Sequence, residues 1–185
     1  FITQARDRGA KVILIDPRFS DSGILADQWI PIRPGTDAAL VAAIAYILET
    51  EGLADGEFMA THTIGYETYR RYLLGLDDDT PKSPAWAEPI TGAPAATIYQ
   101  LAHDYGALKP AALFAGWGPQ RQIYGEQIAR AFITLACLGG NVGVSGGGLA
   151  SVDTRRNLIP VGQLPGGSYA PARFITPGSW ACYIL

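Results

Sequence analysis

Cysteine and histidine are too scarce in this chain to build a common metal site. The 185 residues include two cysteines, Cys137 and Cys182, and two histidines, His62 and His103. Structural zinc sites take four Cys or His ligands, and an iron–sulfur cluster takes four thiolates. Neither histidine has a metal-ligating neighbour one helical turn away. We therefore interpret both histidines as ordinary structural or surface residues.

Charge is also sparse and nearly balanced. Charged residues make up 17% of the chain, with 14 Lys and Arg against 17 Asp and Glu. Because the basic residues are scattered, we expect no face that binds nucleic acid phosphates. Hydrophobic residues make up 48%, which excludes an intrinsically disordered chain. The longest apolar run, residues 38–48, is shorter than the roughly 20 residues needed to cross a bilayer.

The two best-known phosphate-binding motifs are missing. Gly116 and Gly118 begin a pattern like the dinucleotide fingerprint G-x-G-x-x-G, but Arg121 stands where the third glycine belongs. The P-loop pattern G-x-x-x-x-G-K-[ST] does not occur. No spacing of Ser, His and Asp or of Cys and His indicates nucleophilic catalysis. We therefore assign no catalytic residue.

Short apolar runs alternate with helical patterns along most of the chain. We expect strands near residues 12–15, 27–32 and 111–115. The expected helices cover residues 37–51, 55–62, 65–75, 93–106 and 122–138. This alternation predicts an α/β domain over residues 1–148 with a mostly parallel sheet flanked by helices. Residues 149–185, which are rich in Pro and Gly, are expected to form an irregular C-terminal arm.

Polar turns follow the three expected strands. They are residues 16–18, 34–37 and 116–121. Ligands of open parallel sheets bind outside the carboxyl ends of the strands. We therefore expect these three turns to converge on one ligand.

The first two turns carry groups suited to a nucleoside, each with a plainer alternative. Asp16 either accepts the hydroxyls of a ribose or caps the turn at Pro17. Arg18 either holds a phosphate or base, or forms a surface ion pair. Asp37 is favoured at a helix start by the helix dipole. Its carboxylate also matches the adjacent N1–H and N2–H₂ donors of guanine.

The third turn suits a diphosphate. Gly116 and Gly118 allow a backbone to approach a ligand closely. Gln120 offers amide donors and Arg121 offers positive charge. Trp117 fits a hydrophobic core and a ligand wall equally well.

A second glycine-rich segment has several interpretations. Residues 139–143 follow a predicted helix, so a helix-ending turn is their plainest role. The triple glycine at residues 146–148 exceeds what a helix cap requires. It either turns backbone amides toward a ligand or serves as a flexible exit from the domain.

Four segments together resemble a known family. They are IDPRFSD at residues 15–21, ADQWIPIRPGTDAAL at 26–40, GWGPQRQ at 116–122 with GEQ at 125–127, and LGGNVG at 138–143 with two glycines at 146–147. In this order they resemble the molybdopterin oxidoreductases of the dimethyl sulfoxide reductase type. The third segment is most similar to the catalytic subunit of the membrane-associated anaerobic enzymes.

The resemblance implies a bis(molybdopterin guanine dinucleotide) molybdenum cofactor. It places this chain in a Rossmann-like domain that holds one guanosine and part of the adjoining pterin diphosphate. The residues that would hold the guanosine are Asp16, Arg18, Gly35 and Asp37. Those that would face the diphosphate and pterin are Gly116, Trp117, Gly118, Gln120 and Arg121. The implied activity is oxygen-atom transfer that reduces S- or N-oxides in anaerobic respiration.

Several parts of such an enzyme are absent from these 185 residues. The cysteine cluster for a [4Fe–4S] centre and the Ser, Cys or selenocysteine that ligates molybdenum belong to an earlier part of the family's chains. The second guanosine site belongs to a later domain. Because the sequence also begins at Phe1, we expect the central piece of a longer subunit, inactive alone.

The resemblance further implies partners and a location. They are an iron–sulfur electron-transfer subunit and a membrane anchor subunit, in an exported, membrane-associated complex. Two other functions stay open. One is a free-standing module that binds a guanine nucleotide, and the other is a non-catalytic structural domain that keeps the fold without the ligand.

Overall fold

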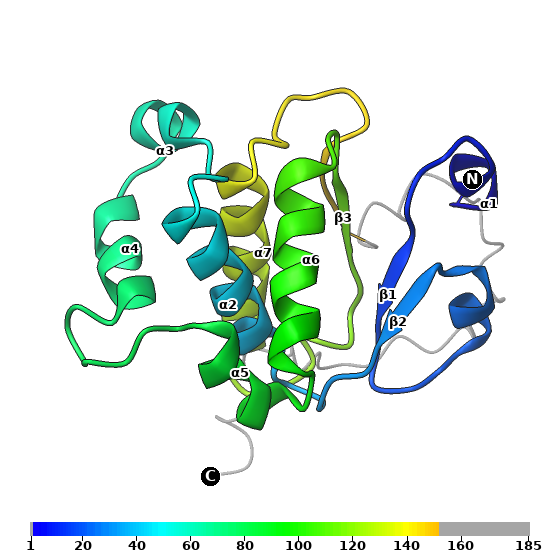
Figure 1. Cartoon of the computed structure of the whole chain (residues 1–185), viewed down its shortest axis with the longest axis horizontal. Coiled ribbons are helices and arrows are strands. Elements are labelled where there is room, and N and C mark those ends of the chain that lie inside the picture. Colours follow the sequence, from blue (N-terminus) through cyan, green and yellow to red (C-terminus); the bar gives the residue numbers. More distant parts are fainter. Residues whose placement is uncertain (1, 152–185) are drawn as a thin grey trace, which may run out of the picture. The chain divides into compact units, whose positions relative to one another are not determined.

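The computed structural model describes residues 2–151, which belong to one compact unit. Their elements, shown in Figure 1, are α1 (Ile2–Asp7), β1 (Ile13–Ile15), the 3₁₀ helix η1 (Asp21–Leu25), β2 (Gln28–Ile30), α2 (Asp37–Thr50), α3 (Gly56–His62), α4 (Tyr66–Leu74), α5 (Pro84–Thr91), α6 (Ala95–Ala107), β3 (Ala112–Ala115), α7 (Gly125–Leu138) and β4 (Gly148–Ser151). No helix among them is long and apolar enough to cross a membrane.

Helix α2 is the centre of this unit. Its sequence is apolar on nearly every side, as expected for a helix surrounded by other elements. Helices α4, α5, α6 and α7 all contact it. Alanines at positions 42, 43 and 45, which are almost completely buried, let these neighbours approach closely.

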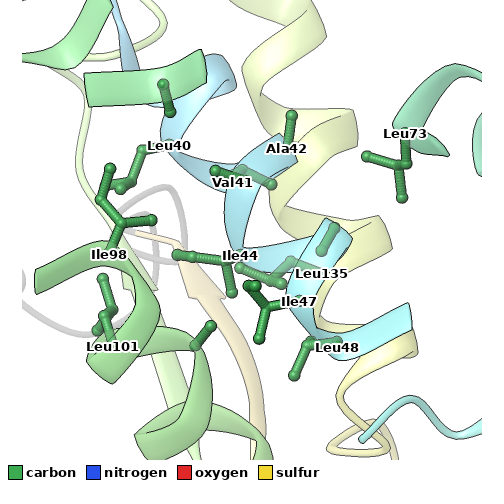
Figure 2. Close-up of a cluster of buried hydrophobic side chains, with 14 of the residues drawn as sticks. Leu40, Val41, Ala42, Ile44, Ile47, Leu48, Leu73, Ile98, Leu101 and Leu135 are labelled. Carbon is green, nitrogen blue, oxygen red and sulfur yellow. The ribbon is translucent and has the colours of Figure 1, made fainter. Parts of the chain in front are cut away.

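One hydrophobic core joins the helices to the strands. Figure 2 shows Ile44 and Leu48 of α2 beside Ile98 and Leu101 of α6 and Leu135 of α7. The core also includes Ile30 of β2, and residues 13, 15 and 113 of the other strands pack against it with partial burial. The strands are therefore held in place by side-chain packing on the helices.

The strands are parallel, as expected, but within residues 2–151 they form two separate two-stranded sheets. Strand β1 pairs with β2, with Ile15 opposite Ile30. Strand β3 pairs with β4, with Ala115 opposite Ser151. The expectation of one mostly parallel sheet is therefore corrected to an α/β arrangement with two small parallel sheets.

Two expected boundaries differ from the structure at loops with unusual backbone geometry. Helix α7 begins at Gly125 rather than at residue 122, because Tyr124 has a left-handed conformation with φ of 60°. Residues 149–151 were expected in the irregular arm, but they form β4 with Gly148. The remainder of that expected arm lies outside the described residues.

Helix α5 was not expected from the sequence. Its start is marked by Ser83, whose side chain accepts a hydrogen bond from the backbone N–H of Trp86, and by Pro84 in the first turn. Pro89 inside the helix argued against it. The helix is only eight residues long, is followed by Gly92, and buries Ala87 in the core that it shares with α2. This packing outweighs the lost hydrogen bond.

We predict that Leu48→Ala lowers the free energy of unfolding by about 2–5 kcal/mol, because it leaves a cavity in the core. Leu48 is 0% exposed, and a Cβ placed on Gly106 would lie 2.8 Å from its Cδ2. Urea unfolding measures the change. The matched control is Ile64→Ala, where the side chain is fully exposed and a change within about 0.5 kcal/mol is expected. Equal losses in the two variants would contradict this account of the core.

Candidate functional site

The turns that follow β1, β2 and β3 lie at one edge of the unit. In Figure 1 these strands run in the same direction, and their carboxyl ends point toward the lower edge of the view. Helices α2 and α7 also begin at that edge. Gln122, which directly follows the third turn, lies against Gly35 of the second turn, because a Cβ added to Gly35 would collide with its Oε1. The second turn therefore lies beside the loop after β3, and the convergence of all three turns on one ligand stays a prediction.

The turn after β1 is held by two hydrogen bonds of Asp16. Its Oδ1 accepts from the backbone N–H of Arg18 at 2.8 Å, and its carbonyl accepts from Nε1 of Trp29 at 2.9 Å. The ring of Phe19 packs edge-on against Trp29, with centroids 5.3 Å apart. Asp16 thus caps the turn. A contact of its carboxylate with a ribose stays a prediction.

Arg18 is exposed and forms no ion pair with any described residue. Its interpretation as a partner of a surface carboxylate is therefore not supported within residues 2–151. It lines an open hollow of about 500 Å³ together with Phe19, Ser20, Asp21 and Ser22. An arginine, two hydroxyl side chains and the carboxylate of Asp21 around a hollow are suited to a polar ligand with both donors and acceptors.

The turn between β2 and α2 is anchored by Arg33. Its guanidinium donates to the carbonyl oxygens of Pro89 and Ile90 at the end of α5, and its backbone N–H donates to Thr91 O at 2.7 Å. The hydroxyl of Thr36 donates back to Arg33 O at 2.6 Å. Arg33 and Thr36 are therefore engaged in fixing the turn that carries Gly35 and Asp37.

Asp37 is the residue at this edge whose charge the fold disfavours. Burial raises the pKa of its carboxyl group, and a hydrogen bond to its own backbone N–H offsets only part of that effect. Within residues 2–151 its side chain forms no ion pair and no hydrogen bond with another residue. A partly dehydrated carboxylate with no partner is suited to accept hydrogen bonds from a ligand.

In the loop after β3, the space beside Gly116 and Gly118 is not filled by other described residues. A Cβ on Gly116 or on Gly118 would meet nothing within 4 Å, and neither residue has positive φ. The packing of the described residues therefore does not require glycine at these positions. Gly125, in contrast, is required, because its Cβ would collide with the carbonyl of Gln120. That close approach folds the loop back on the start of α7.

Arg121 and Trp117 lie together in this loop. The guanidinium carbon of Arg121 is 5.5 Å from the centroid of the Trp117 ring, within the range of a cation–π contact. Trp117 is half-buried and Arg121 is exposed. Beside them, a mainly apolar recess of about 160 Å³ includes Gly116, Gln120 and Phe132 in its wall. The loop therefore combines one exposed positive charge with an exposed amide at Gln120.

The second glycine-rich segment lies at the opposite ends of β3 and β4. Gly148 pairs with Ala112, the first residue of β3. Asn141 is fully buried, and its Oδ1 accepts from the backbone N–H of Ala111 at 2.9 Å. Gly139 N–H donates to Leu135 O at 2.9 Å, which ends α7. The helix-ending interpretation is thus confirmed, and this segment lies away from the three turns.

The donors and acceptors at this edge fit the nucleotide end of a pterin cofactor. A carboxylate acceptor, two exposed arginines, and glycines without protein neighbours match a base edge, a diphosphate and a close backbone approach respectively. No group of three or more His, Cys, Asp or Glu side chains within residues 2–151 is arranged to hold a metal.

Two residues at this edge were not selected from the sequence. Arg33 is an anchor whose partners come from a helix that was not expected, so no local pattern indicated it. Gln122 contacts Gly35 across a long sequence separation. Its place directly after Arg121 in the loop was the available indication.

The family profile and the individual relatives described here match most of this chain. The sequence profile of the family described as molybdopterin oxidoreductase matches residues 1–176. Dimethyl sulfoxide reductase DmsA is 45% identical in Haemophilus influenzae and 46% identical in Escherichia coli, over 89% and 80% of this chain. Trimethylamine-N-oxide reductase of Haemophilus influenzae is 43% identical over 76%.

This chain spans about a fifth of the length of these relatives, with 22%, 20% and 17% of them covered respectively. Among solved structures, acetylene hydratase from Pelobacter acetylenicus matches 74% of this chain with 28% identity and a TM-score of 0.67. That match covers 18% of the acetylene hydratase chain. The similarity therefore concerns one part of much longer proteins.

We predict that Asp37→Asn stabilises the ligand-free protein increasingly as the pH rises. Because the folded-state pKa of Asp37 is raised, the unfolded chain releases this proton first, and ionisation then disfavours folding. Below the unfolded pKa both states are protonated, and the difference between the variants disappears. Thermal unfolding from about pH 3 to about pH 7 spans this titration.

The matched control for this pH series is Glu126→Gln. Glu126 is an exposed acid in the first turn of α7, which has the same length as α2. Its neutralisation should give no gain in stability at neutral pH, because the helix dipole favours an acid there. A stability gain from Asp37→Asn that does not change with pH would contradict the role of burial at Asp37.

Proposed function

Since this chain belongs to the molybdopterin oxidoreductase family, we propose that its three turns hold one guanosine end of a bis(molybdopterin guanine dinucleotide) molybdenum cofactor. The observation that carries the proposal is the partly buried carboxylate of Asp37, which has no partner within residues 2–151 and lies on a turn that touches the loop after β3. Family membership itself implies a molybdenum–pterin cofactor, and the guanine dinucleotide form is our proposal.

Each turn takes one part of the nucleotide. Asp37 accepts the N1–H and N2–H₂ donors of guanine, and Gly35 brings the turn close to the base. Asp16 uses the oxygen that does not cap its turn to accept a ribose hydroxyl. Arg18 supplies positive charge from the hollow beside it. These roles need only binding and orientation, which is what a protein supplies to a cofactor enzyme.

The loop after β3 faces the diphosphate and the pterin. Gly116 and Gly118 allow the backbone to approach, since nothing in the described protein occupies the space beside them. Gln120 and Arg121 donate hydrogen bonds to phosphate oxygens. Trp117, in contact with Arg121, forms the apolar side of this surface.

We propose that the complete protein reduces S- or N-oxides. The names of the dimethyl sulfoxide and trimethylamine-N-oxide reductases among its relatives support this substrate class. The molybdenum cofactor, when bound, supplies oxygen-atom transfer. The residues of this chain contribute by fixing one nucleotide end and thereby the orientation of the whole group.

The remaining parts of the proposal concern protein outside these residues. The two small sheets belong to one Rossmann-like sheet that other strands complete. A [4Fe–4S] centre and the molybdenum ligand come from preceding residues. An iron–sulfur electron-transfer subunit and a membrane anchor subunit complete an exported, membrane-associated complex.

We predict that Asp37→Ala weakens retention of the cofactor roughly 10- to 100-fold in the complete enzyme, because hydrogen bonds to a charged acceptor are lost. Molybdenum and the GMP released by acid hydrolysis, both counted per polypeptide, measure retention. Glu126→Ala, an equivalent loss of an acid from a first helical turn, should leave both unchanged. Full cofactor content in the Asp37→Ala enzyme would refute the assignment of this site.

A separate prediction concerns the 185-residue chain by itself. It should show no turnover and far less than one molybdenum per chain, because a single nucleotide end provides few of the contacts to the cofactor. Metal analysis and a reductase assay test this directly. Titration with GDP tests the alternative function, since binding at micromolar GDP without a pterin would favour a free-standing nucleotide module.

A further inference from the structure

We propose that Gln122 is an additional guanosine-binding residue, and that its carboxamide N–H group donates a hydrogen bond to the base. This inference rests on the proposed function of the site. It concerns a residue to which neither the family resemblance nor the comparisons assign a role.

The position of Gln122 is set by its contact with Gly35. An ideal Cβ on Gly35 would lie 2.9 Å from Cδ and 3.2 Å from Nε2 of Gln122 and would collide with Oε1. The carboxamide therefore lies against the open face of the glycine. Gly35 has φ of 80°, a conformation that favours glycine independently. Both the contact with Gln122 and the positive φ therefore require glycine at position 35.

The hydrogen-bonding capacity of this carboxamide is unused within the described protein. Gln122 is exposed, and its side chain forms no hydrogen bond with any residue in the range 2–151. Arg33 and Thr36, on the turn that Gln122 contacts through Gly35, are engaged with α5 and with the turn itself. Gln122 therefore presents two free N–H donors beside the turn that carries Asp37.

A donor beside the turn that carries Asp37 complements guanine. The carboxylate is an acceptor and matches N1–H and N2–H₂. The adjacent O6 of guanine is an acceptor and requires a donor, which a carboxylate cannot provide. Adenine carries the reverse pattern, with a donor at position 6 and an acceptor at N1. The pair of Asp37 and Gln122 therefore distinguishes guanine from adenine.

Two variants of similar length separate a donor from the alternatives. Gln122→Met keeps the length of the side chain and its packing on Gly35 but removes all hydrogen bonds. Gln122→Glu keeps an acceptor and removes the donors. In the cofactor-loaded complete enzyme, we expect both variants to release GMP-containing cofactor roughly 3- to 10-fold faster on mild warming, as the loss of one hydrogen bond predicts.

The rate of cofactor release shows whether the Gln122 side chain donates a hydrogen bond, accepts one or only packs. A wild-type rate in Gln122→Met means that the side chain only packs, and a wild-type rate in Gln122→Glu means that it accepts. Either result overturns the inference. Because Gln122 is exposed, the melting temperature of the cofactor-free variants should stay at the wild-type value, which separates a binding role from a structural one.

Two further variants complete the design. Gln127→Met, at an exposed position one turn into α7, is the control for the substitution itself and should release cofactor at the wild-type rate. Asp37→Ala reports on the site as a whole. Loss of cofactor in Asp37→Ala with unchanged release in Gln122→Met would refute the role of Gln122 alone, whereas retention in Asp37→Ala would refute the proposed site.

Discussion

The burial of α2 on all sides is the constraint on which the rest of the structure depends. Four helices pack around it, and the strands join the same core. Because these contacts position the helix, they also place its first residue, Asp37, at the edge where the strands end. Arg33 then ties the preceding turn to α5. The position of one carboxylate thus follows from apolar packing along the 14-residue helix that it begins.

The helices were predictable where a single periodicity continues for several turns. Residues 122–138 carry such a pattern, and α7 forms there. Helix α2 forms at the longest apolar run of the chain, residues 38–48. The short α5 was missed because Pro89 weakened its pattern, and its stability comes from Ala87 packing on a helix distant in sequence. Strand β4 was missed because glycine-rich sequence disfavours strands. Its pairing with β3 depends on backbone partners that no local pattern reveals.

The candidate site was predictable in its residue types and only partly in its geometry. The polar turns were located by the strands they follow, so Asp16, Asp37 and the loop after β3 fall where expected. The contact of Gly35 with Gln122 and the anchoring of Arg33 join segments far apart in sequence. Such contacts depend on how helices pack. The glycine-rich segment 139–148 shows the opposite case. Its composition is compatible with a ligand-binding loop, but in the structure it ends α7 and contains the buried Asn141, which binds the backbone of Ala111.

The two small sheets depend on the helical core for their stability. An isolated two-stranded sheet is marginal in water, and these sheets persist because one face of each packs on the helical core. The other face of β3 carries Phe114, which is 73% exposed. Within residues 2–151 the strands therefore pack on the helical core, and Phe114 stays exposed on the other face of β3.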